Sequence, residues 1–185
     1  MNANQANPER LATGSADFDR ILGGGLPVRS INLIAGEPGT GKTLLALQTI
    51  FHLARQGRKC VYLTTLSEPS LKLVRYMQQF SFFDESLMDR AVAFADLGSV
   101  IRGKGEEAIL TEITARVERE EPAVVVIDSF KAVLELVQES AVRTFVYDLA
   151  VHMAGWGAAT LLVGEYSDAE IATNSEFKSP MASSA

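Results

Sequence analysis

The sequence predicts an α/β fold in which helices cover both faces of a mainly parallel β-sheet. From Ser30 onward, apolar runs of strand length alternate with longer amphipathic runs of helix length. Several apolar runs, such as Val124–Ile127, are continuous, which is typical of strands that are covered on both faces. Because parallel strands need a crossover and crossovers are almost always right-handed, we expect successive strand–helix–strand units to build one sheet.

The N-terminal segment precedes this alternation. Residues 1–10 are mostly polar, and we expect them to form a flexible leader. Ser15 can cap a short helix that runs through Leu22. Three glycines, Gly23–Gly25, then end the helix, because glycine tolerates positive φ angles.

The remaining elements follow from the hydrophobic pattern. Apolar runs predict strands over residues 31–35, 60–65, 91–96, 123–128 and 158–164. Amphipathic runs predict helices over residues 42–56, 68–80, 106–120 and 141–154. These elements form one predicted domain over residues 11–177, and residues 178–185 are expected to be a tail.

Composition limits the class of protein. The chain has 185 residues, of which 47% are hydrophobic and 22% charged, so it can bury a substantial core. Its net charge of −6 matches a nucleic-acid backbone poorly, and no apolar run reaches the roughly 18 residues that a membrane span needs. A single cysteine excludes an internal disulfide framework and fits a cytoplasmic location.

A glycine-rich segment between the first long strand and its helix carries the strongest chemical signal. It matches the phosphate-loop pattern G-x-x-x-x-G-K-[ST] and consists of Gly36, Glu37, Pro38, Gly39, Thr40, Gly41, Lys42 and Thr43. Its glycines let successive N–H groups point inward at a phosphate, beside the positive end of the following helix. Lys42 adds a positive charge, and the Thr43 hydroxyl can bind Mg²⁺.

A second signal is the aspartate that ends the strand 123–128. Asp128 is expected at the carboxyl edge of the sheet, where ligands bind in open α/β folds. A carboxylate there can hold Mg²⁺ opposite Thr43. The 86 residues between Lys42 and Asp128 contain two further predicted strands, a spacing that suits ATPases of the RecA kind.

The end of the strand 60–65 offers a candidate catalytic base. Glu68 follows this strand, and a carboxylate at that edge can orient or deprotonate an attacking water. A purely structural interpretation also fits. Ser67 can cap the next helix, and Glu68 is then a first-turn acid that the helix dipole favours.

These motifs together resemble KaiC-type ATPases of the RecA superfamily. The resemblance begins with Thr13-Gly14, Asp17–Asp19 and Leu22–Pro27, continues through the phosphate loop and Val124–Ser129, and reaches about Phe177. It implies a RecA-like P-loop NTPase fold, binding of ATP with Mg²⁺, slow hydrolysis, and assembly into homo-oligomeric rings. Some members also transfer phosphate to their own Ser or Thr.

The sequence departs from the family pattern in two places. Family members often carry a Glu-Glu pair after the second strand, with the first Glu as general base, whereas this chain has Ser67-Glu68. The family domain also continues into further strands and a Lys/Arg segment that reaches the neighbouring subunit's nucleotide, but this chain departs at Lys178. We therefore expect a C-terminally truncated or divergent member whose sheet has an open edge.

These observations predict a function together with alternatives. The expected activity is weak Mg²⁺-dependent ATP hydrolysis, with Lys42 and Glu68 as the catalytic residues. A module that binds ATP as a switch or assembly ligand, without turnover, is the main alternative. A DNA-recombination accessory is less favoured, because the chain is acidic and lacks a basic loop. A self-phosphorylating kinase is a further, weaker alternative.

Overall fold

The computed structural model describes residues 9–65, 70–98, 106–167 and 170. Its main sheet has five parallel strands in the order β3-β7-β6-β4-β5. The strands are β3 (Ile31–Gly36), β4 (Cys60–Thr64), β5 (Val92–Asp96), β6 (Val124–Asp128) and β7 (Ala159–Glu165). The predicted parallel sheet is confirmed. A separate antiparallel pair, β1 (Arg10–Leu11) and β2 (Leu26–Pro27), was not predicted.

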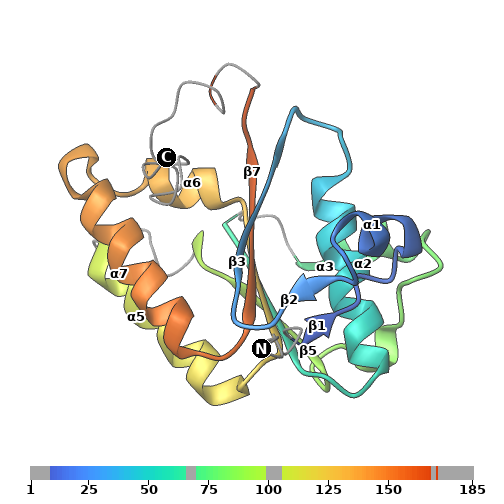
Figure 1. Cartoon of the computed structure of the whole chain (residues 1–185). Helices are drawn as coiled ribbons and strands as arrows, with labels where there is room; N and C mark the ends of the chain where they lie inside the picture. Colours follow the sequence, from blue (N-terminus) through green and yellow to red (C-terminus); the bar gives the residue numbers. More distant parts are fainter. Residues whose placement is uncertain (1–8, 66–69, 99–105, 168–169, 171–185) are drawn as a thin grey trace, which may run out of the picture.

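Helices lie on both sides of this sheet, as the sequence predicted (Figure 1). One side carries α1 (Ala16–Ile21), α2 (Lys42–Arg55) and α3 (Ser70–Met77). The other carries α5 (Glu106–Glu120), α6 (Phe130–Glu135) and α7 (Val142–Gly155). Two short 3-10 turns, η1 (Glu85–Leu87) and η2 (Glu139–Ala141), complete the described elements.

Two helices show what local sequence signals can and cannot reveal. The predicted cap of α1 is present, because the Ser15 side chain accepts a hydrogen bond from Phe18 N at 3.4 Å. The helix α6 was missed. It has only six residues, too few for a helical repeat to stand out, although Ser129 caps it through a 3.3 Å hydrogen bond from Ala132 N.

The strand residues alternate between two hydrophobic cores. In β6, Val124 and Val126 pack in the core that contains α2, whereas Val125 and Ile127 pack in the core that contains α5 and α7. All four side chains are fully buried, which explains why the run is continuously apolar. Asp128 comes two residues after Val126, so its side chain falls on the α2 side of the sheet.

The topology brings the ends of distant segments to one edge of the sheet. Because all five strands are parallel, the residues that follow β3, β6 and β7 lie at the same carboxyl edge. Among the described strands β3 lies at the end of the sheet, with β7 between it and β6. In the same described part of the chain, no helix is long and apolar enough to cross a membrane.

The two-core packing gives a test of the fold. Replacing Ile113 of α5, which is fully buried, with Ala should lower the free energy of unfolding by about 2–5 kcal/mol through lost burial and a cavity. The same change at Ile21 of α1, which is 78% exposed, should alter it by less than about 0.5 kcal/mol. Urea unfolding of both variants provides the measurement, and equal losses would contradict this assignment of the core.

Candidate functional site

The loop between β3 and α2 has the backbone conformation that an anion nest requires. Gly39 and Gly41 adopt φ angles of 78° and 89°, which side chains disfavour. A Cβ atom at either position would meet no atom within 4 Å, so these glycines are needed for their backbone angles rather than for space. Such left-handed positions turn successive N–H groups toward a common centre.

One carbonyl group organises this loop. The Glu37 carbonyl oxygen accepts hydrogen bonds from Lys42 Nζ at 2.8 Å and from Thr40 Oγ1 at 2.9 Å. Lys42, which is only 9% exposed, therefore extends back over the loop instead of into solvent. Its ammonium group is thus held against the loop, where its charge favours an anion.

The N-terminus of α2 adds to the positive potential. Its N-cap residue is Gly41, which provides no side-chain hydrogen bond, and the first turn contains no acidic residue. The first N–H groups of a helix lack partners within the helix and carry part of the positive end of its dipole. A phosphate group is a suitable partner for such a helix end.

A buried carboxylate lies next to this helix end. Asp128, at the end of β6, accepts hydrogen bonds at Oδ2 from Thr43 Oγ1 and from Tyr62 OH, each at 2.7 Å. Thr43 belongs to the first turn of α2 and Tyr62 to the middle of β4, so one carboxylate oxygen links three elements. A carboxylate has capacity for further hydrogen bonds, which leaves room for the water shell of a cation.

Burial changes the acid–base properties of this group. The pKa of Asp128 is raised, mainly because burial disfavours its charge, although the hydrogen bonds from Tyr62 and Thr43 oppose the rise. The pKa of Tyr62 is raised well above its ordinary value by burial and then by the negative charge of Asp128. Tyr62 therefore remains a neutral hydrogen-bond donor.

The residues fit a small, hard cation. The Thr43 hydroxyl and the Asp128 carboxylate are oxygen ligands of the type that Mg²⁺ prefers, and their hydrogen-bonded oxygens lie 2.7 Å apart. Lys42, Thr43 and Asp128 all line one cavity of about 620 Å³ at the carboxyl edge of the sheet. The structure therefore brings these three predicted residues together, and their roles in binding remain predictions. Glu68 lies outside the described residues.

Some residues of this site were not expected from the sequence. Tyr62 was interpreted only as part of an apolar strand, yet its hydroxyl donates a hydrogen bond to Asp128, which lines the cavity. Its only sequence signal is an even spacing from the buried positions that face α2. Lys131 gave no signal, because it lines the cavity only through the placement of α6. Glu135 is a further unexpected lining residue. Glu165, at the end of β7, also lines the cavity.

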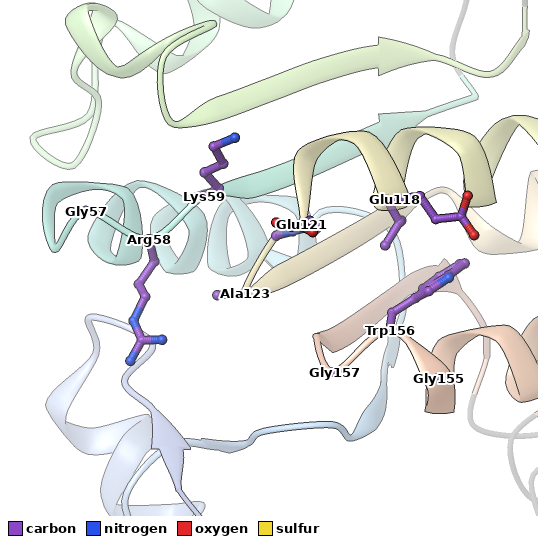
Figure 2. Close-up of a pocket in the computed structure, with 11 residues that line it drawn as sticks. Gly57, Arg58, Lys59, Glu118, Glu121, Ala123, Gly155, Trp156 and Gly157 are labelled. Carbon is purple, nitrogen blue, oxygen red and sulfur yellow. The ribbon is translucent and has the colours of Figure 1, made fainter.

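A larger cavity, of about 830 Å³, lies at the opposite edge of the sheet (Figure 2). It is lined by the segments that precede β4, β6 and β7, including Lys59, Ala123 and Trp156. Arg58 and Lys59 extend to opposite sides there (Figure 2), and Arg58 pairs with Glu9 at 3.1 Å. Ligands of open α/β sheets bind at the carboxyl ends of strands, so the smaller cavity is the better candidate.

The parallel sheet, the phosphate loop and the aspartate at the end of β6 define a P-loop nucleotide-binding domain of the RecA-like class. A family model described as "ATPase: KaiC" matches residues 11–178. The chain therefore belongs to the KaiC ATPase family, which confirms the resemblance seen in the sequence.

Individual relatives agree with this assignment. A UPF0273 protein of Thermotoga maritima is 30% identical over 177 residues, covering 88% of this chain and 72% of its own. DNA repair protein RadA of Pseudomonas aeruginosa is 30% identical over 161 residues, which cover 84% of this chain but 32% of RadA. The crystal structure of a KaiC-like protein of Pyrococcus horikoshii superposes with a TM-score of 0.74 at 28% identity, covering 86% of this chain and 73% of that one.

The charge of the buried Asp128 carboxylate should lower the stability of the free protein, although the same carboxylate is the predicted metal ligand. Because the folded-state pKa of Asp128 is raised, its stabilising contribution is complete at pH values below the pKa of the unfolded chain and is lost as pH rises through the folded-state pKa. Asp128→Asn should therefore raise the melting temperature at pH 7.5 by about 2–4 °C, or about 1 kcal/mol.

The same variant should lose the effect of Mg²⁺ on nucleotide affinity. Thermal unfolding without nucleotide at pH 7.5 and at pH 4 measures the difference in melting temperature between the variant and the wild type. This difference should shrink at pH 4. A variant that is less stable than wild type at pH 7.5 would show that the charge of Asp128 stabilises the fold.

Proposed function

We propose that this domain binds ATP together with Mg²⁺ and hydrolyses it slowly. The observation that carries the proposal is the 2.7 Å contact between Thr43 and Asp128, directly beside the uncapped N-terminus of α2. Phosphate ligands and cation ligands thus lie side by side in one cavity. Membership of the KaiC ATPase family supports adenosine as the nucleoside, since the loop itself contacts only phosphates.

The residues would divide the work by their chemistry. The loop N–H groups and Lys42 hold the phosphates, while Thr43 and Asp128 hold Mg²⁺, which neutralises charge that develops on the phosphates. Tyr62 keeps the Asp128 carboxylate in place through Oδ2. In this scheme Tyr62 is a positioning residue and never touches the nucleotide.

Two statements about partners belong to the proposal. Homo-oligomeric ring assembly is supported by membership of a family in which assembly is common. A role in DNA repair, suggested by the name of the RadA relatives, is less well supported. The matched region is about a third of RadA, and this chain carries a net charge of −6.

Lys42 provides the first test of nucleotide binding. Lys42→Ala should weaken ATP–Mg²⁺ binding by about tenfold or more, because it removes a charge-assisted hydrogen bond to phosphate. Titration calorimetry on the folded variant is the measurement. Lys59→Ala removes the same charge at the opposite edge of the sheet and serves as the control. Equal affinities for Lys42→Ala and wild type would refute the assigned site.

Glu68 distinguishes hydrolysis from the alternative of a switch without turnover. If Glu68 is the general base, Glu68→Gln should lower the rate of phosphate release by about a hundredfold and leave ATP affinity nearly unchanged. Steady-state phosphate release and calorimetry on the same preparation measure both. Tight binding with no turnover in the wild type would favour the switch, and unchanged turnover in the variant would exclude Glu68 as the base.

A further inference from the structure

A second lysine, Lys131, lines the same cavity as the phosphate loop. Lys131 belongs to the first turn of α6, three residues beyond Asp128. Its Nζ atom donates a hydrogen bond to Glu170 Oε1 at 2.8 Å and lies 5.4 Å from the centre of the Tyr166 ring. The side chain is 35% exposed, so its ammonium group is neither buried nor free in solvent.

Glu170 is held in place as the partner of this lysine. Its second oxygen, Oε2, accepts hydrogen bonds from Ser167 N at 2.8 Å and from Ser167 Oγ at 2.9 Å. The hydrogen bond from Lys131 is the largest of the effects that lower the pKa of Glu170 to about 2. Glu170 thus stays charged at physiological pH and is the counter-ion of Lys131 that a competing anion would have to displace.

The charged side chains that line the cavity determine how favourably an anion would bind there. Two ammonium groups, those of Lys42 and Lys131, line it together with three carboxylates, those of Asp128, Glu135 and Glu165. The ammonium group of Lys131 offsets part of this acidic lining, in addition to Lys42, the N-terminus of α2 and the Mg²⁺ proposed at Thr43 and Asp128.

The position of Lys131 determines which phosphate its ammonium group can contact. The loop and the N-terminus of α2 hold the part of the polyphosphate next to α2, whereas α6 packs in the core on the other face of the sheet. If a polyphosphate starts at the loop and extends past Thr43 and Asp128, which line the same cavity as Lys131, its last phosphate is the group that would face Lys131. A diphosphate would have no group in that position.

We propose that Lys131 binds the terminal phosphate of a nucleoside triphosphate and thereby distinguishes it from a diphosphate, with Glu170 as the counter-ion that the phosphate displaces. This inference rests on the proposed function, since it assigns a residue to the same nucleotide site. It also links nucleotide state to the segment after β7, because release of Lys131 frees Glu170 and Ser167 from α6.

The test compares two nucleotides on matched variants. Lys131→Met keeps most of the apolar stem and removes the charge, and Lys59→Met makes the same change at the opposite edge of the sheet. Calorimetry with Mg²⁺ uses ADP and the β,γ-imido analogue of ATP. Lys131→Met should weaken binding of the ATP analogue about tenfold and that of ADP less than about twofold. Lys131→Arg should restore most of the loss.

The counter-ion Glu170 provides a second test, in which its variant should bind the ATP analogue more tightly rather than more weakly. Glu170→Gln should strengthen binding of the ATP analogue by about two- to fivefold, because Lys131 no longer leaves a charged partner. An equal loss for both nucleotides in Lys131→Met, or no loss, would overturn the assignment to the terminal phosphate. If the wild type binds neither nucleotide, the proposed function itself fails, and that result is distinct from either of these.

Discussion

The site depends on one carboxylate oxygen that receives two hydrogen bonds. Asp128 Oδ2 is joined to Thr43 on α2 and to Tyr62 on β4, so the helix that follows the phosphate loop is fixed against the centre of the sheet. Because these contacts form within the folded chain, the oxygens that we propose as cation ligands are held in position without any ligand. Such preorganisation reduces the conformational entropy that is lost when a ligand binds and side chains become ordered.

The same arrangement explains why the carboxylate is an unfavourable residue for stability. Burial raises the pKa of Asp128, and the two hydrogen bonds compensate only in part. An apolar residue would suit a fully buried strand such as β6 better. A cation bound as proposed would supply the missing compensation for this buried charge.

Both lysines of the cavity have partners within the protein that resemble phosphate oxygen. Lys42 donates to the Glu37 carbonyl oxygen, and Lys131 donates to the Glu170 carboxylate. Each ammonium group is therefore kept near the cavity rather than in bulk solvent. The two partners, Glu37 and Glu170, belong to different parts of the chain. Glu37 belongs to the loop itself, whereas Glu170 follows β7, so the second contact is the one through which the proposed nucleotide binding would affect another part of the chain.

Local chemistry allowed the sequence alone to predict the sheet, most helices and the phosphate loop. Continuous apolar runs reveal strands such as Val124–Asp128, and the glycines of the loop are dictated by backbone angles that few other residues adopt. Membership of the KaiC ATPase family also followed from contiguous motifs.

The tertiary structure alone determined which side chains surround the cavity. Strand order and side-chain alternation bring Tyr62 within hydrogen-bond distance of Asp128, 66 residues away in the chain. The placement of the short helix α6 brings Lys131 into the same cavity. Such contacts join residues that are distant in sequence, and no local pattern encodes them, because they arise only when separate elements pack against one another.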